Sequence, residues 1–222
     1  MIPDLVVSDL AGTAVEDPGL VLGAFRAGLA VARAEADDER LRGLMGVDKR
    51  EAFARLLDTD PHDDRVDAAL AAFVDRAVDD ARSGRYAPLP GVADAIARLE
   101  AAGVRVAFTT GFGTEILRAI TAANGWAEHA GRSVASDEVP NGRPAPDVVL
   151  EAMRRSGVED AARVAVLGDT VIDVGCARAA GAGWAIAVLT GSGRREELEK
   201  AGGTVVPDLA AAVDLLLGPA TV

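Results

Sequence analysis

The chain has 222 residues, of which half are apolar and about a quarter are charged, and its net charge is −12 at pH 7. This composition is typical of a soluble globular protein, and the length suffices for one large domain with a smaller inserted unit. The acidic balance argues against a nucleic-acid partner and against binding to an anionic membrane surface.

The sequence predicts neither a signal peptide nor a membrane span. Asp4 and Asp9 interrupt the N-terminal apolar run, and no basic stretch precedes it, so the segment does not resemble a signal peptide. No apolar run reaches the roughly 18 residues of a membrane span. The single cysteine, Cys176, fits a reducing compartment. We therefore expect a cytoplasmic protein with no membrane partner.

Short β-branched runs alternate with helical segments, which predicts βαβ units around a parallel sheet. The expected strands are residues 5–8, 104–109, 134–136, 164–167 and 185–189, with 204–206 as a weaker sixth. The expected helices are residues 92–102, 114–124, 146–156, 173–181 and 194–201. This pattern predicts an α/β fold whose core is a Rossmann-like parallel sheet.

One long segment interrupts this alternation. Residues 18–85 contain helical patterns without a convincing strand, and loops are expected at residues 35–46 and 58–64. The segment follows the first strand directly and returns through the Gly- and Pro-rich stretch "SGRYAPLPGV". We predict a core domain of residues 1–17 and 86–222, into which residues 18–85 are inserted as a helical cap domain.

Polar side chains stand where several predicted strands end, and the sites of parallel sheets lie beyond these carboxyl ends. Asp9 follows the first strand, Thr110 follows the second, and Asp169 and Asp173 follow the fourth. Arg143 comes from the Pro-rich turn "NGRPAP". The acids can hold Mg²⁺, and the hydroxyl and the cation can hold an anion that shares the ion.

Taken in order, the stretches "LVVSDLAGTAVED", "AFTTGF", "NGRPAP" and "GDTVID" resemble the four motifs of the haloacid dehalogenase superfamily. The resemblance covers the whole chain and implies a Mg²⁺-dependent hydrolase of a small phosphorylated or phosphonylated metabolite. It implies that Asp9 forms an aspartyl-phosphate, that Thr110 binds the phosphoryl group, and that Arg143 replaces a usual lysine. The implied Mg²⁺ ligands are Asp9, the Ala11 carbonyl, Asp169 and Asp173. For Asp173 a direct bond, a bond through water and bracing of the loop are the open alternatives. The implied substrate-binding residues are Gly12, Thr13, Gly46 and Gly111.

The first motif departs from the superfamily pattern, because Ala11 stands where a second aspartate commonly protonates an oxygen leaving group. With "MGVDK", which ends at Lys49, this departure resembles the phosphonoacetaldehyde hydrolases. The resemblance implies that Lys49 forms an imine with a substrate aldehyde, which acts as the electron sink when a C–P bond breaks. Ala52 and Phe112 stand where those enzymes have a histidine and a tyrosine.

Other interpretations remain open at this point. Lys49 could bind substrate only through its charge, in a phosphate-monoester phosphatase of the phosphoglycolate or sugar-phosphate type, or it could lie in solvent. An imine-forming lysine needs burial or a nearby cation, for which Arg42 and Arg50 are the candidates. A non-enzymatic switch phosphorylated on Asp9 does not account for the helical insert.

Two glycine-rich stretches give only weak support for nucleotide binding. The stretches "TGFGTEI" and "TGSGRREE" each contain Gly-x-Gly but lack the third glycine of a dinucleotide-binding loop. The sequence does not determine the oligomeric state, and a homodimer is one option.

Overall fold

A computed structural model describes residues 2–45 and 47–219, and within them six strands form one parallel sheet. The strands are β1 (Leu5–Asp9), β2 (Arg105–Thr110), β3 (Val134–Ala135), β4 (Val164–Gly168), β5 (Trp184–Val188) and β6 (Thr204–Val206). Their order across the sheet is β3-β2-β1-β4-β5-β6. The order reverses between β1 and β4, which is where ligands bind in sheets of this kind. The α/β, Rossmann-like fold class is thereby confirmed.

Helices cover both faces of the sheet. They are α5 (Val92–Ala101), α6 (Thr114–Ala123), α7 (Asp147–Ser156), α8 (Val171–Ala179), α9 (Arg195–Lys200) and α10 (Leu209–Leu217). Short 3₁₀ helices occur at η1 (Ala127–His129), η2 (Ser136–Glu138) and η3 (Ala161–Arg163). Leu5 and Val7 belong to an apolar cluster with residues of α7 and α8, whereas Val6 belongs to one with residues of α5, α6 and α10. Alternate residues of β1 therefore face opposite layers.

The predicted elements agree with the structure to within about two residues at their ends. The third predicted strand is shorter than expected, because Ser136 already begins η2. The prediction of a loop over residues 35–46 is wrong in part, since α2 (Asp38–Arg42) lies within it. The Asp37 side chain accepts a hydrogen bond from the backbone N–H of Arg40 at 2.8 Å, and Leu41 is fully buried. A helix cap and one anchoring side chain suffice for this short helix.

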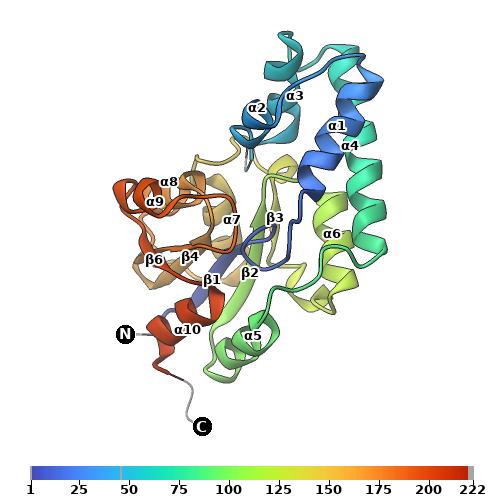
Figure 1. The fold of residues 1–222 in the computed structure, drawn as a ribbon. Helices are drawn as coiled ribbons and strands as arrows, with labels where there is room; N and C mark the ends of the chain where they lie inside the picture. Colours follow the sequence, from blue (N-terminus) through green and yellow to red (C-terminus); the bar gives the residue numbers. More distant parts are fainter. Residues whose placement is uncertain (1, 46, 220–222) are drawn as a thin grey trace.

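Three longer helices complete the segment between β1 and α5, and Figure 1 shows them with α2 on one side of the molecule, away from both termini. They are α1 (Leu20–Val31), α3 (Lys49–Leu57) and α4 (Asp64–Arg82). Phe25, Phe53 and Phe73 come from these three helices, and their ring centroids lie 5.1–5.8 Å apart. Phe73 also lies 6.0 Å from Phe112, so the apolar packing continues toward the sheet.

The chain enters and leaves this group of helices through two paired segments. The backbone N–H of Glu16 donates to the Ala87 carbonyl at 2.8 Å, and that of Leu89 donates to the Ala14 carbonyl at 3.1 Å. These bonds place the two connections side by side. The action of α1–α4 as a separate cap domain stays a prediction.

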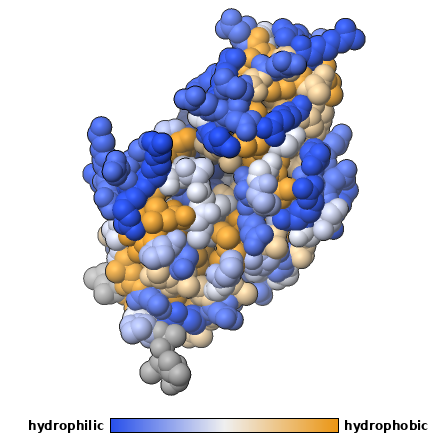
Figure 2. Space-filling model, in the orientation of Figure 1, coloured by the Kyte–Doolittle hydropathy of each residue, from blue (hydrophilic) through white to orange (hydrophobic). Residues whose placement is uncertain are grey.

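The molecular surface mixes polar and apolar side chains. Figure 2 shows hydrophilic residues predominating at the top of the view, over the group α1–α4, and again over α9. Within the described residues, no helix is both long enough and apolar enough to cross a membrane.

Gly28 of α1 packs closely against α4, and this close packing yields a stability prediction. A Cβ atom at Gly28 would lie 2.5 Å from the Ala69 carbonyl oxygen, which belongs to rigid helix backbone. We expect Gly28→Ala to destabilise the protein by about 1–3 kcal/mol, measured by urea denaturation. Gly23→Ala, in the same helix, meets only the end of the Arg76 side chain at 3.7 Å and should be neutral or stabilising. Equal denaturation midpoints for the two variants would contradict the close-packing argument.

Candidate active site

A small pocket lies at the carboxyl edge of the sheet, between the sheet and helices α1 and α3. Its volume is about 30 Å³, which is roughly that of one water molecule. Eight of the residues singled out in the sequence line it: Asp9, Ala11, Lys49, Thr110, Gly111, Arg143, Asp169 and Asp173. The remaining lining residues are Val21, Met45, Phe112, Thr170 and Ser192.

Strand register explains why residues distant in sequence meet here. Asp9 pairs with Thr109 across β1 and β2, and Ser8 pairs with Leu167 across β1 and β4. The residues that follow on the neighbouring strands, Thr110 and Asp169, therefore emerge at the same edge as Asp9.

One guanidinium group connects two of the three pocket carboxylates. Nη1 of Arg143 donates to Oδ1 of Asp9 at 2.6 Å and also to Oδ1 of Asp173. The other oxygen of Asp173, Oδ2, accepts hydrogen bonds from the backbone N–H and the hydroxyl of Thr170, at 3.1 and 2.6 Å. Since both of its oxygens are engaged, Asp173 is arranged to brace Arg143 and the start of α8.

The carboxylates are crowded in a dry environment, which changes their acidity. Burial raises the pKa of Asp9 to about 8, with Arg143 opposing the rise and the carboxylates of Asp173 and Asp169 adding to it. Burial and Asp173 raise the pKa of Asp169 to about 6, against hydrogen bonds from Ser192. Three buried acids face one buried guanidinium, so the charged forms of the acids are short of positive charge.

The donor set suits a hard divalent cation. Asp9, Asp169 and Ala11 line the pocket, and their carboxylates and backbone carbonyl are possible oxygen ligands. Mg²⁺ binds through one or two carboxylates while keeping several waters. An added dication would also relieve the repulsion between the acids. The residues present therefore fit Mg²⁺.

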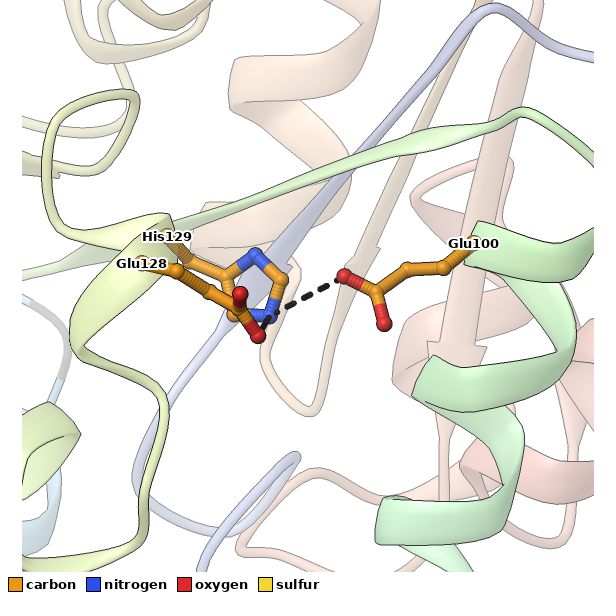
Figure 3. A group of neighbouring side chains, drawn as sticks. All are labelled: Glu100, Glu128 and His129. Atoms are coloured by element: carbon orange, nitrogen blue, oxygen red, sulfur yellow. Dashed lines mark ion pairs between the residues drawn. The ribbon is translucent and has the colours of Figure 1, made fainter.

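A second group of acidic and histidine side chains lies outside the pocket. In the described part of the chain, only Glu100, Glu128 and His129 bring such ligand atoms within 4.8 Å of one another (Figure 3). Nε2 of His129 lies 3.6 Å from Glu100 and 3.9 Å from Glu128. Nδ1 lies 3.3 Å from a guanidinium nitrogen of Arg132. The imidazole is thus surrounded by two carboxylates and a guanidinium group.

Lys49, the first residue of α3, is only 3% exposed. Its Nζ donates to the Val47 carbonyl at 2.7 Å and lies 5.3 and 5.7 Å from the ring centroids of Phe25 and Phe112. Burial, reinforced by the positive charge of Arg143, lowers the pKa of Lys49 to about 7. A large share of this amine is therefore uncharged at neutral pH.

The cation near Lys49 differs from the two expected from the sequence. Arg50 is bound to Asp67 at 2.6 Å, and Arg42 lies near Asp38 at 3.7 Å, both toward solvent. Arg143 is the cation that lowers the pKa of the lysine. The prediction that Arg42 or Arg50 is the cation beside Lys49 is wrong, because both side chains are partly exposed and pair with other acids.

The four predicted substrate-binding residues have different positions in the structure. Gly111 lines the pocket beside Thr110, whose hydroxyl oxygen accepts from the Phe112 N–H at 3.1 Å and keeps its proton for another acceptor. Gly12, at φ +84°, lines an adjacent hollow. Thr13 is fully buried and is not among the residues that line the pocket. Gly46 lies outside the described residues.

Some pocket residues were not anticipated from the sequence. Ser192 binds Asp169 through its backbone N–H at 2.7 Å, and Thr170 caps α8 beside Asp173. The stretch "TGSGRREE" lacks the third glycine of a dinucleotide-binding loop, and its position after a predicted strand is the sequence signal that places it at the site. Phe112 was noted only as a departure from the phosphonoacetaldehyde hydrolase pattern.

The fold and the strand-end acids define a hydrolase class, and comparison with known families agrees. The family model of the haloacid dehalogenase-like hydrolases matches residues 3–181, and the chain belongs to this family.

The similar proteins include both phosphatases and phosphonoacetaldehyde hydrolases. "Probable phosphatase IndB" of Dickeya dadantii is 32% identical over 208 residues, covering 92% of this chain and 89% of that protein. "Phosphonoacetaldehyde hydrolase" of Pseudomonas fluorescens is 32% identical over 210 residues, covering 85% and 73%. The crystal structure of CbbY from Rhodobacter sphaeroides in complex with phosphate aligns with a TM-score of 0.78 at 26% identity, covering 95% and 96%.

The burial of Lys49 predicts a pH-dependent stability. Its pKa is about 7 in the folded chain against 10.5 for a free side chain, so between these values only the unfolded chain binds the proton. Wild-type stability should therefore rise with pH across this window, and at or below pH 7 the full cost of burial is present. We expect Lys49→Met to gain about 2–4 kcal/mol at pH 6, since each pKa unit represents about 1.4 kcal/mol.

Chemical denaturation at pH 6 and pH 9 measures this difference. The gain of Lys49→Met over the wild type should shrink at the higher pH. Lys200→Met removes the exposed lysine at the end of α9 and serves as the matched control, with no such gain. A gain for Lys49→Met that is the same at both pH values would contradict the lowered pKa.

Proposed function

We propose that this protein is a Mg²⁺-dependent hydrolase that cleaves the C–P bond of a small aldehyde-bearing phosphonate. Asp9 takes up the phosphoryl group, and Lys49 forms an imine with the aldehyde. One observation carries the proposal: a buried lysine with a pKa near 7 and no carboxylate partner in the described part of the chain lines the same pocket as Asp9. An uncharged amine is the form that attacks a carbonyl group.

The amino-acid usage of the chain supports this role. The sequence contains two lysines against 21 arginines, and only Lys49 lies in the pocket. An arginine would bind a substrate anion at least as well through a fixed charge, but it cannot form an imine. A lysine at this position is therefore chemically distinctive in this chain.

The first chemical step prepares the carbon that must leave. The amine of Lys49 adds to the substrate aldehyde, and loss of one water gives the imine. Protonation of the imine nitrogen makes it an electron acceptor next to the C–P bond. The apolar rings of Phe25 and Phe112 limit the access of bulk water to this nitrogen.

The second step transfers the phosphoryl group. A carboxylate oxygen of Asp9 bonds to phosphorus as the C–P bond breaks, and the bond's electron pair moves into the iminium to give an enamine. Arg143 and Thr110 supply a cation and a hydroxyl donor to the phosphoryl oxygens, where charge spreads in the transition state. Asp9, Asp169 and the Ala11 carbonyl would hold Mg²⁺, which supplies further positive charge to those oxygens when bound.

Two hydrolyses complete the balance. Water cleaves the aspartyl-phosphate, which restores Asp9 and releases inorganic phosphate. Protonation of the enamine carbon and hydrolysis of the resulting imine release the dephosphonylated aldehyde and restore Lys49. The net reaction consumes one water per C–P bond. It needs no acid at position 11, because no alkoxide leaves, and Ala11 is consistent with this.

Substrate access requires a larger space than the inner pocket offers. A neighbouring hollow of about 720 Å³ shares Lys49 and Arg143 with it and lies between α3, α4 and the loop before α7. We propose that α1–α4 act as a cap that moves to admit the substrate through this hollow.

Phosphate-monoester hydrolysis is the second candidate. The alignment with the probable phosphatase from Dickeya dadantii covers 92% of this chain, and the structure of CbbY contains phosphate. In this reading Lys49 binds substrate by charge, and another group protonates the leaving oxygen. A lysine of lowered pKa is poorly suited to that task, because it is only partly charged at neutral pH.

Imine trapping separates the two candidates. Borohydride added during turnover of phosphonoacetaldehyde should inactivate the wild type and add the reduced carbon skeleton to the peptide containing Lys49, as detected by mass spectrometry. Lys49→Arg keeps a positive charge and should lose both phosphate release and trapping. Lys200→Arg, the control at the only other lysine, should keep both.

The phosphatase candidate predicts the opposite pattern. It would be favoured by wild-type protein that is not trapped, by rapid hydrolysis of sugar phosphates, and by a Lys49→Arg variant that remains active. Ala11→Asp would then equal or exceed the parent on a phosphate ester, since it supplies the missing proton donor.

Replacement of Asp9 tests the nucleophile for either substrate class. Asp9→Asn keeps the side-chain size but removes the attacking charge, so phosphate release should fall by at least ~10³-fold. The melting temperature and circular dichroism should remain those of a folded protein. A carefully purified variant that retained more than a few per cent of the activity would exclude Asp9 as the nucleophile.

A further inference from the structure

The loop of residues 190–193, between β5 and α9, takes no part in the chemistry proposed above. Its sequence, Thr-Gly-Ser-Gly, lies at the carboxyl edge of the sheet next to the β4 loop that carries Asp169. Its backbone and hydroxyl groups contact Asp169 and Gly12, which belong to two other loops. This loop therefore joins the ends of β1, β4 and β5.

Ser192 occupies one oxygen of Asp169 and leaves the other free. Its backbone N–H donates to Oδ2 at 2.7 Å, and its hydroxyl donates to the same oxygen at 3.2 Å. Within the described residues, Oδ1 of Asp169 accepts no hydrogen bond. A carboxylate held in this way has a fixed orientation and one oxygen available as a ligand.

Glycines bring the backbone against this carboxylate. A Cβ atom on Gly191 would overlap Oδ2 of Asp169, and one on Gly12 would lie 3.1 Å from the same oxygen. Gly12 also has φ +84°, a backbone conformation that suits glycine. The Asp169 carboxylate is therefore in close contact with both loops, so it has little room to rotate.

A hydroxyl links the two loops directly. Oγ1 of Thr190 donates to the Gly12 carbonyl oxygen at 2.7 Å. Gly12 lies three residues after Asp9 and next to Ala11, so this bond fixes the loop that carries both. The positions of Asp9 and Asp169 relative to each other thus depend on residues 190–193.

We infer that residues 190–193 are a positioning clamp, which holds Oδ1 of Asp169 and the loop after β1 in the arrangement that binds a divalent cation. Thr190 and Ser192 are positioning residues, and Gly191 permits their approach. The inference rests on the proposed function in one respect, namely that Asp169 is a ligand of the cation. Partners that orient metal ligands typically contribute 10–100-fold to metal affinity.

Direct cation binding tests the clamp without relying on activity. Free Mn²⁺ is measured by electron paramagnetic resonance with the full-length protein, and Mg²⁺ is then added as a competitor. Gly191→Ala should weaken Mn²⁺ binding about 10–100-fold, because its methyl group displaces the Asp169 carboxylate. Gly131→Ala is the matched control, since nothing lies within 4 Å of its added atom, and it should bind as the wild type does.

A second variant decides the matter if Gly191→Ala fails to fold. Thr190→Val keeps the shape of the side chain but removes the bond to Gly12, and we expect about 3–10-fold weaker Mn²⁺ binding at an unchanged melting temperature. Wild-type affinity in whichever of Thr190→Val and Gly191→Ala folds, together with weak binding by Asp169→Asn, would overturn the clamp alone. Wild-type affinity in Asp169→Asn would instead overturn the role of Asp169 in the proposed function.

Discussion

The structure depends most on the charge balance around Arg143. Three buried carboxylates face this one buried guanidinium, and Asp9 and Asp173 share a single nitrogen of it. The same positive charge favours the ionised form of Asp9 and disfavours the ionised form of Lys49. One residue therefore promotes the charge of the group proposed to attack phosphorus and suppresses the charge of the group proposed to attack a carbonyl. The acids remain short of positive charge, which is the condition under which a divalent cation binds with most benefit.

The sheet topology is what allows this balance to form. Asp9 comes from β1, Asp169 from the loop after β4, and these two strands are neighbours where the strand order reverses. Arg143 arrives from the segment between η2 and α7, and the loop after β5 contacts Asp169 from the other side. Asp9 and Asp169 lie at the ends of paired strands, so backbone hydrogen bonding determines their positions, whereas Arg143 and the loop after β5 are held by side-chain and loop contacts. The buried apolar layers on both faces of the sheet supply that rigidity.

Sequence reasoning succeeded where the signal was local. Asp9 and Asp169 could be identified because each follows an apolar, β-branched run. All six strands could be located from such runs and from the helical segments that alternate with them. It failed where tertiary packing decides, as with the cation beside Lys49: Arg42 and Arg50 are near in sequence, whereas Arg143 is brought in by the fold. The sequence did not predict α10, a short apolar helix that packs against α5. It also did not predict that Ser192 binds Asp169, because a Gly-rich loop is equally typical of nucleotide binding and of a tight turn.

The environment of Lys49 is built from the residues that hold α1–α4 together. Phe25 contacts both Phe53 and Phe73 in the packing of these helices, and its ring also lies beneath the Lys49 amine. Phe112 extends the same packing from the end of β2. The low pKa of Lys49 thus depends on the packing of these helices over the sheet, because contact of Nζ with water would restore its charge. If α1–α4 move as the proposed cap, an entering substrate would meet a more protonated lysine, and return of the helices would restore the uncharged amine that an imine requires.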